Sequence, residues 1–370
     1  MPPCALPRDG GRAPGVPPAA RWACDTLCQG CNIVTQGQPW FGLRVWRLLF
    51  WLLALSMPSM VAAGCPGSEL RLLPLAPGLW WVPAAPGESD GGNRGQVSNI
   101  VLAQEGRGRA ARLWALGSGP SPAWGRALAC QAQARLGLPI SDVISPWARP
   151  ELVLGVVGLR QAGPVRHWAH ASVAQAMAEQ CPHCVARLRQ RLQAAASDLG
   201  DDPIHLPDQL LQGEQGRLGP FDWWRLPRAE GRWITVWRLR PTGAKQAPLW
   251  VAHGLLQGEG PPDGRDADLA LLLQASQRLA ALAAVDGPAA RFIGEQGPVM
   301  GADAPARHAA YWAGLLDAAR AAVARGDDEA APAPAWPGLP ALWQAHPWHG
   351  FNWQRAWRQI EPEVLAAPSR

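Results

Sequence analysis

The pattern of apolar and polar positions predicts strands that alternate with helices from residue 70 onward. Apolar or alternating runs bounded by turn residues indicate strands at 70–75, 78–82, 98–103, 111–116, 140–145, 231–240, 247–256 and 290–299. Apolar residues at helical spacing indicate helices at 122–136, 171–199, 269–284 and 306–325. Strands and helices follow one another in two successive halves, which predicts an α/β (α+β) fold built as a four-layer αββα sandwich.

Three further segments flank this pattern. Residues 327–340 are rich in Pro and Ala and are expected to be a linker, and residues 341–370 form a Trp-rich C-terminal tail with a helix. Residues 1–40 are rich in Pro, Gly and Arg, which we interpret as an N-terminal extension upstream of the true start, or as disordered chain. The globular domain is therefore expected to span residues 65–326.

Residues 41–64 have the pattern of a secretory signal peptide. Two arginines precede the apolar run LLFWLLAL, and small residues follow it. The run is too short to span a bilayer comfortably. We therefore expect export to the periplasm, with cleavage after Ala63. The alternative is a weak lipobox that leaves a lipid anchor on Cys65, so that the mature protein meets a membrane only through this segment.

The charge pattern argues against nucleic acid as a partner. The formal net charge is +5, but the arginines are scattered and Lys245 is the only lysine. The chain also has 21 tryptophans, which fit either core packing or a stacking surface for a ligand.

The spacing of the cysteines suggests one disulfide and leaves two further cysteines that can form a second one. Residues 24–31 hold a C-x3-C-x2-C spacing that can ligate iron–sulfur clusters, but the segment precedes an export signal and no cluster is expected. Cys181 and Cys184 form a C-P-H-C motif, and in an oxidising compartment we expect them to form a structural disulfide. A thiol–disulfide role or metal binding is the alternative. Cys65 and Cys130 remain as a further pair.

Residues 143–155, VISPWARPELVLG, carry the most informative motif. A short apolar strand enters a Pro-containing loop, and a second apolar segment follows. This frame resembles the zinc-binding turn of the metallo-β-lactamase superfamily, in which the loop reads His-x-His-x-Asp-His. Trp147 and Arg149 stand at the first two histidines, Glu151 at the aspartate and Leu152 at the last histidine.

The resemblance covers residues 70–326 and is nearest to exported zinc metallohydrolase-like proteins associated with quinoprotein oxidation systems. Gly117 stands at the aspartate of an Asp-x-Gly motif, and loop 241–248 lacks a further ligand histidine. His253 follows Ala252 where relatives have Gly-Asp, and Gln296 replaces the final histidine. The family fold is therefore expected together with a degenerate metal site.

The substituted side chains are poor zinc ligands. Catalytic zinc takes about three ligands from His, Cys or carboxylate side chains. Arg149 is a permanent cation and Leu152 has no lone pair, so only Glu151 and His253 are competent donors. We expect no cofactor, with Arg149 paired to Glu151 or to groups near His253 in place of the metal.

Taken together, these residues suggest an exported, non-catalytic binding or accessory protein. The resemblance implies service to a periplasmic quinoprotein oxidation system, with a small molecule or a periplasmic protein as partner, and Trp147 is expected to plug the cleft or to face a ligand. One alternative is a metal-dependent hydrolase with a rearranged site at Glu151, His253 and Glu295. The other is thiol–disulfide chemistry at the C-P-H-C motif.

Two histidines, His167 and His170, are spaced to share one face of a helix, where His170 is expected to cap or stabilise the helix.

Overall fold

The computed structural model describes residues 65, 70–241, 243 and 246–366. The chain divides into two units, and every described residue belongs to the unit Ala63–Arg370. The expected N-terminal extension, signal peptide and C-x3-C-x2-C segment lie outside the described residues.

The first sheet has seven strands in sequential order. Strands β1 to β4 pair antiparallel, and β4 to β7 pair parallel. Their bounds are β1 Leu73–Ala76, β2 Leu79–Val82, β3 Ile100–Glu105, β4 Arg112–Leu116, β5 Ile140–Ser145, β6 Arg166–His170 and β7 Gln209–Leu211.

The second sheet has five strands in the order β12-β11-β10-β9-β8. Its strands pair antiparallel except for β11 and β12, which pair parallel. Their bounds are β8 Gln215–Leu218, β9 Phe221–Ala229, β10 Arg232–Leu239, β11 Leu249–Val251 and β12 Arg291–Ile293.

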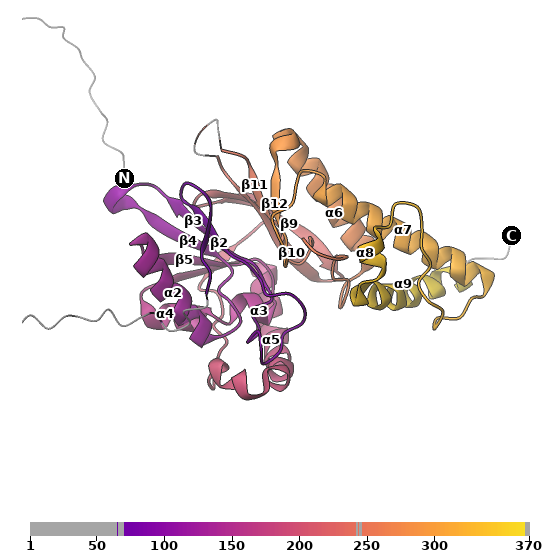
Figure 1. The fold of residues 1–370 in the computed structure, drawn as a ribbon, viewed down its shortest axis with the longest axis horizontal. Coiled ribbons are helices and arrows are strands. Elements are labelled where there is room, and N and C mark those ends of the chain that lie inside the picture. Colours follow the sequence, from indigo (N-terminus) through magenta and orange to yellow (C-terminus); the bar gives the residue numbers. More distant parts are fainter. Residues whose placement is uncertain (1–64, 66–69, 242, 244–245, 367–370) are drawn as a thin grey trace, which may run out of the picture. The chain divides into compact units, whose positions relative to one another are not determined.

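Helices cover the outer face of each sheet (Figure 1). The first group is α2 Pro122–Leu136, α3 Pro150–Val153, α4 Val156–Ala162 and α5 Ala171–Leu192. The second group is α6 Leu269–Ala283, α7 Ala304–Arg325, α8 Ala341–Gln344 and α9 Pro347–Ala366. Three short 3-10 helices, Gly108–Ala110, Gln193–Leu199 and Ala284–Ala289, complete the described elements.

The alternation of side chains along the strands confirms the predicted αββα sandwich. In β3, Ile100 and Leu102 pack with the helices of the first group, while Val101 and Ala103 face the second sheet. In β11, Trp250 packs with the helices of the second group, while its neighbours in the strand face the first sheet. Because successive strand residues point to opposite faces, this pattern requires two sheets face to face with a helical layer outside each.

The local signals in the sequence place some helix ends accurately. Helix α2 has the predicted bounds, because Ser121 caps it by accepting a hydrogen bond from the Trp124 amide and Pro122 fits its first turn. Helix α5 ends at Leu192 instead of continuing to residue 199, since the chain tightens there into a 3-10 helix.

The prediction that two histidines share a helix face is wrong. His167 and His170 both lie in strand β6, where an odd spacing places side chains on opposite faces. The capping role expected for His170 is confirmed, because its Nδ1 accepts a hydrogen bond from the Ser172 amide at the start of α5.

The Trp-rich tail packs into the second helical layer. Trp353, Ala356, Trp357 and Ile360 of α9 are buried in the same apolar cluster as the inner faces of α6 and α7. The segment Leu269–Ala289, which joins α6 to the 3-10 helix after it, is long and apolar enough to cross a membrane by composition, but the buried face of α6 belongs to this cluster, as expected for a core helix.

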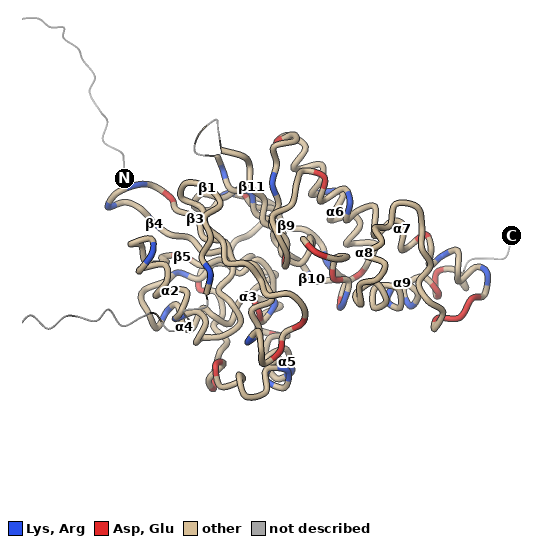
Figure 2. Tube along the Cα trace, viewed as in Figure 1, with Lys and Arg blue, Asp and Glu red and all other residues tan. Residues whose placement is uncertain are grey.

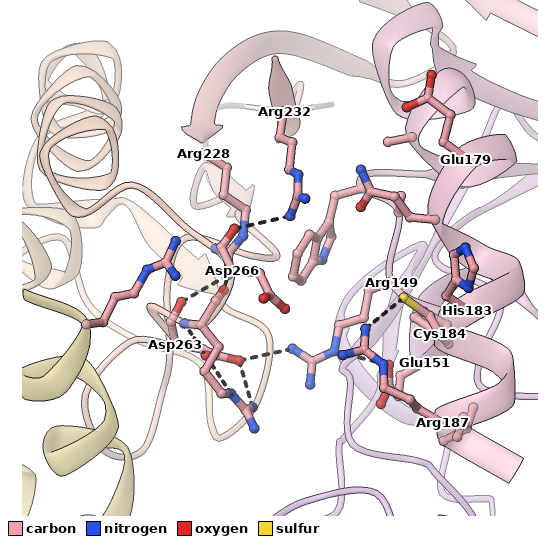
Figure 3. Close-up of a pocket in the computed structure, with 18 of the residues that line it drawn as sticks. Arg149, Glu151, Glu179, His183, Cys184, Arg187, Arg228, Arg232, Asp263 and Asp266 are labelled. Carbon is pink, nitrogen blue, oxygen red and sulfur yellow. Dashed lines mark hydrogen bonds and ion pairs between the residues drawn. The ribbon is translucent and has the colours of Figure 1, made fainter. Parts of the chain in front are cut away.

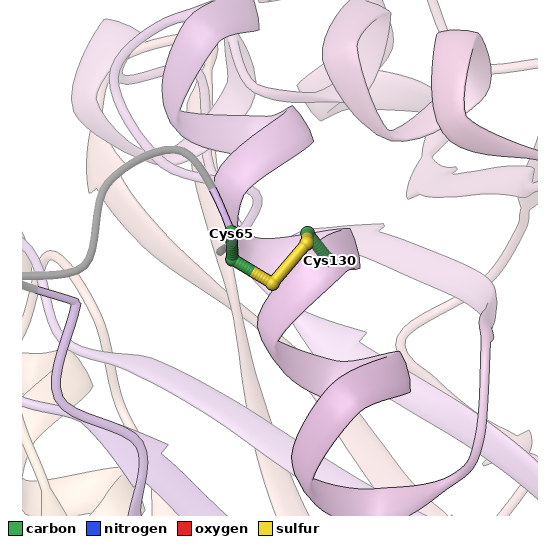
Figure 4. The surroundings of a disulfide bond; sticks show 2 residues. All are labelled: Cys65 and Cys130. Carbon is green, nitrogen blue, oxygen red and sulfur yellow. A yellow bond between two sulfur atoms is a disulfide. The ribbon is translucent and has the colours of Figure 1, made fainter. Parts of the chain in front are cut away.

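The disulfide pattern differs from the main prediction. Cys65 bonds to Cys130 of α2, whereas Cys181 and Cys184 are free thiols, so the expected Cys181–Cys184 disulfide is wrong (Figure 4). Both thiols lie in one continuous helix, α5, which turns Cys181 into the core and leaves Cys184 partly exposed. The Cys65 sulfur is also committed to the disulfide, which contradicts a lipid on the same atom.

Candidate functional site

The loop that stands in place of the zinc-binding turn, here called the altered loop, follows β5 and lies between the two halves of the sandwich. It connects β5 to α3, and the Pro146 carbonyl accepts hydrogen bonds of 2.8 and 2.9 Å from the amide and hydroxyl of Thr235 in β10. The following Trp147, Arg149 and Glu151 line a cavity of about 640 Å³ (Figure 3). The opposite walls of this cavity come from α5, from β9 and β10 and from α9. Six positions were predicted to line the former metal site, and three of them line this cavity. The six are Trp147, Arg149, Glu151, Leu152, His253 and Gln296.

Arg149 forms the centre of a buried charge cluster in this wall. Its Nε lies 3.2 Å from Glu151 Oε2 and 3.6 Å from Glu295 Oε1, and its Nη1 lies 3.7 Å from Asp263 Oδ2. Burial alone acts to lower the pKa of Arg149, but these carboxylates outweigh it and raise that pKa above its usual value. The expected pairing of Arg149 with Glu151 is therefore confirmed.

The carboxylates of this cluster are also saturated by other donors. Glu151 Oε1 accepts a hydrogen bond of 2.6 Å from the Ser89 hydroxyl. Glu295 accepts from the Ser98 hydroxyl, from the Trp147 indole at 3.2 Å and from the Gly254 amide at 2.9 Å. Few lone pairs of these two side chains remain for any other cation.

Trp147 lies between the two halves of the sandwich. It packs against the apolar clusters of both halves, and its ring is within van der Waals reach of Gly254. The Arg228 guanidinium carbon lies 4.5 Å from the ring centroid, which is cation–π distance. Trp147 therefore fills the cleft and also presents part of its surface to the cavity.

Two further charged residues were missed by the sequence reasoning. Arg228 is buried and hydrogen-bonded to the carbonyls of Gly254, Asp263 and Arg265. Asp263 pairs with both Arg149 and Arg265. Both lie outside the motifs that the resemblance uses, and only the tertiary structure brings them to Arg149.

The substitutions at Gly117 and Leu152 are physically coupled. Gly117 has a φ of +83°, and a Cβ added there would approach Leu152 Cδ2 to 2.9 Å and Ile100 Cδ1 to 2.6 Å. Leu152 is fully buried in the core of the first half. The leucine thus occupies the volume that a side chain at position 117 would need, and neither position offers a polar atom to the cleft.

His253 and Gln296 lie behind the cavity and do not line it. His253 is buried, and its Nε2 donates to the Asn99 carbonyl at 2.7 Å, so Nδ1 carries the lone pair and has no partner among the described residues. Burial lowers the pKa of His253. The Gln296 amide is bonded to the Gly87 carbonyl and the Gln257 side chain.

These donors do not fit a catalytic zinc. Among the described residues at the former ligand positions, His253 Nδ1 is a nitrogen without a partner, and the Glu151 and Glu295 carboxylates are paired with a guanidinium that cannot deprotonate. Within the described part of the chain, no group of three or more His, Cys, Asp and Glu side chains is arranged to hold a metal ion.

The C-P-H-C motif contributes a single accessible thiol to the cavity. Cys184 lines it together with His183, and its sulfur accepts a hydrogen bond of 3.4 Å from Arg187. Cys181 is buried, and burial raises its pKa to about 12. A dithiol redox pair needs a nucleophilic thiolate on the first cysteine, which this environment disfavours.

Comparison with known proteins gives structural matches only. No protein-family model matches the sequence, and no curated protein does. A β-lactamase domain protein from Burkholderia ambifaria is 18% identical, with 82% of this chain and 92% of that chain covered and a TM-score of 0.54. A metallo-β-lactamase from Erythrobacter litoralis, solved with β-mercaptoethanol in its active site, is 15% identical, with 67% and 97% covered and a TM-score of 0.50. The chain therefore has the metallo-β-lactamase fold.

Proposed function

We propose that this chain is a non-catalytic binding protein on the metallo-β-lactamase fold. The observation that carries the proposal is the position of Arg149, which lies among the carboxylates of Glu151, Glu295 and Asp263 at the altered zinc loop. A guanidinium can neutralise these carboxylates, but it cannot activate a water molecule as zinc does. The adjoining cavity of about 640 Å³ is large enough for a small-molecule ligand.

The proposal includes export to the periplasm and an accessory role in a quinoprotein oxidation system. The signal-like pattern of residues 41–64 supports export, and so does the Cys65–Cys130 disulfide, because structural disulfides persist in oxidising compartments. The quinoprotein link rests on the sequence resemblance. Fractionation of cells that express the full chain, with N-terminal sequencing of the mature protein, tests export. An uncleaved cytoplasmic product would contradict it.

A hydrolysis assay tests the non-catalytic role. The purified protein is incubated in zinc-supplemented buffer with a chromogenic β-lactam and with a p-nitrophenyl ester, beside an E151A variant. We expect the rates of both proteins to equal the buffer rate for each substrate. A rate above buffer that disappears in E151A would overturn the proposal, because it would assign catalysis to the altered loop.

A further inference from the structure

The cavity beside Arg149 carries an excess of positive charge. Among its lining residues, arginines outnumber aspartates and glutamates by eight to four. Four of these arginines are neutralised by ion pairs: Arg149, Arg191, Arg265 and Arg358. A fifth, Arg228, is held by backbone carbonyls and by the Trp147 ring.

The other three arginines, Arg187, Arg232 and Arg355, form no ion pair with a carboxylate of the described chain. Each forms a single hydrogen bond within the described part of the chain, which leaves most of its five N–H donors without an acceptor there. The contacts are Arg187 Nη2 to Cys184 Sγ at 3.4 Å, Arg232 Nη1 to the Asp266 carbonyl at 3.5 Å and Arg355 Nε to the Ala267 carbonyl at 3.0 Å.

These three arginines reach the same cavity from different parts of the fold. Arg187 lies on α5, Arg232 on β10 and Arg355 on α9. Figure 3 shows Arg187 and Arg232 on opposite sides of the space in front of Arg149. Basic and acidic positions are otherwise interspersed over the described elements (Figure 2). Within the described chain, three guanidinium groups without an ion pair therefore lie around one cavity, together with two lining carboxylates, Glu179 and Asp266.

The same cavity has an apolar component. Trp147 and Trp233 line it, and so does Phe351, whose side chain is 53% exposed although it is large and hydrophobic. An exposed phenylalanine at the rim of a charged cavity provides a surface for an apolar or ring-shaped group. Guanidinium groups bind carboxylate, sulfonate and phosphate groups through paired hydrogen bonds.

We propose that the cavity binds an organic anion, whose acidic group is attracted by the guanidinium groups of Arg187, Arg232 and Arg355 around the cavity and whose apolar body packs against Trp233 and Phe351. This inference rests on the proposed binding function and adds the class of ligand. Binding requires no metal and no covalent bond to the protein.

Fluorescence titration with 1-anilinonaphthalene-8-sulfonate tests the inference, since this probe joins a sulfonate to aromatic rings. We expect saturable binding to the full-length protein that weakens as salt rises, because the arginines lie near the surface. In the triple variant R187Q/R232Q/R355Q, we expect the dissociation constant to rise about tenfold or more. Thermal unfolding of each variant checks that it is folded, and the three single variants replace the triple variant if it is not.

A matched variant controls for net charge. R107Q/R109Q/R135Q removes three exposed arginines outside the cavity, and we expect it to bind the probe as the unmodified protein does. Equal weakening in both triple variants, or no weakening in the cavity variant, would overturn the inference.

A neutral probe separates this inference from the proposed function. N-phenyl-1-naphthylamine has the same rings without the sulfonate. If it binds as tightly as the sulfonate and the cavity arginines do not affect it, the cavity binds ligands but the anion class is wrong. Zinc-dependent hydrolysis would instead overturn the proposed function, whatever the probes show.

Discussion

Arg149 Nε lies 3.2 Å from Glu151 Oε2, two residues further along the chain in the first turn of α3. These are positions at which the resemblance implies two zinc ligands, a histidine and an aspartate. Here one carries a permanent positive charge and the other a negative charge, so the pair neutralises itself without a metal. The buried cluster extends to Glu295 and Asp263, which makes Arg149 the cation on which several buried carboxylates depend.

The variant R149M is therefore expected to destabilise the protein. Removal of one partner from a buried ion cluster leaves uncompensated charge and costs about 3–5 kcal/mol of unfolding free energy. Urea denaturation measures the change. The double variant R149M/E151Q is expected to recover part of the loss, since it removes one of the stranded carboxylates.

An exposed ion pair provides the control for this prediction. Arg320 and Asp317 form a solvent-exposed pair on α7, and R320M is expected to change stability by less than about 1 kcal/mol. If R149M and R320M cost the same, the cluster around Arg149 does not stabilise the fold as described.

Asp263 is expected to make the site sensitive to strong acid. Burial acts to raise the pKa of Asp263, but Arg265 and Arg149 outweigh it and lower that pKa to about 2. A carboxyl group with a depressed folded pKa stabilises the protein above its unfolded pKa, and this contribution disappears as pH falls from about 4 through about 2. Unfolding free energies of the protein and of D263N, measured across this window, are expected to converge as pH falls. A constant difference between them would contradict the assigned pKa.

His308 is expected to make stability depend on pH in a milder range. It is fully buried, its Nδ1 donates to the Ala304 carbonyl at 2.8 Å and its Nε2 accepts from the Gln257 amide at 2.9 Å. Burial lowers its pKa to about 4. The unfolded chain therefore binds a proton first as pH falls from about 6.5, and up to about 3 kcal/mol of stability is lost by about pH 4.

The variant H308Q tests this prediction. We expect H308Q to be less stable at pH 7.5 and to lose less stability than the unmodified protein between pH 7 and pH 4.5. Parallel curves for the two proteins would assign the acid sensitivity to other groups.

The cysteines give a prediction that needs no variant. Cys65 and Cys130 are expected to resist alkylation until reductant is added, Cys184 to react in the folded protein, and Cys181 to react only after unfolding. Peptide mapping by mass spectrometry measures the alkylation of each of these four cysteines. A peptide that links Cys181 to Cys184 would contradict the arrangement in α5.

Loss of the Cys65–Cys130 disulfide is expected to destabilise the fold. C65S/C130S opens a bond between cysteines 65 residues apart and is expected to cost about 2–5 kcal/mol. The variant C184S, which removes a free thiol, is the matched control and is expected to have little effect in thermal unfolding.

Much of the architecture could be predicted from the sequence because local signals and periodicity agree. Ser121 and Pro122 fix the start of α2, and Gly137 ends it in a left-handed conformation, so its bounds follow from the residues themselves. Strand β9 was missed, since Pro227 interrupts it and its partly exposed charged residues hide the alternation. It forms because β10 supplies its pairing partner across a tight turn.

The candidate site could be predicted only in part. The motif around residue 147 located Trp147, Arg149 and Glu151 because they are close in sequence. Arg228 and Asp263 come from other segments, and their approach to Arg149 depends on how the two halves pack. The Cys181–Cys184 disulfide was predicted from the C-P-H-C motif and the expected oxidising compartment, neither of which shows that α5 continues through Pro182 without interruption.

The metal content of the purified protein tests the central claim most directly. The protein is produced in medium with added zinc, dialysed without chelator and analysed by inductively coupled plasma mass spectrometry beside E151A/H253A. We predict substoichiometric zinc and iron, at the same level in both proteins, because Arg149 already neutralises the carboxylates of Glu151 and Glu295. One or more metal ions per chain that the double variant loses would contradict the account.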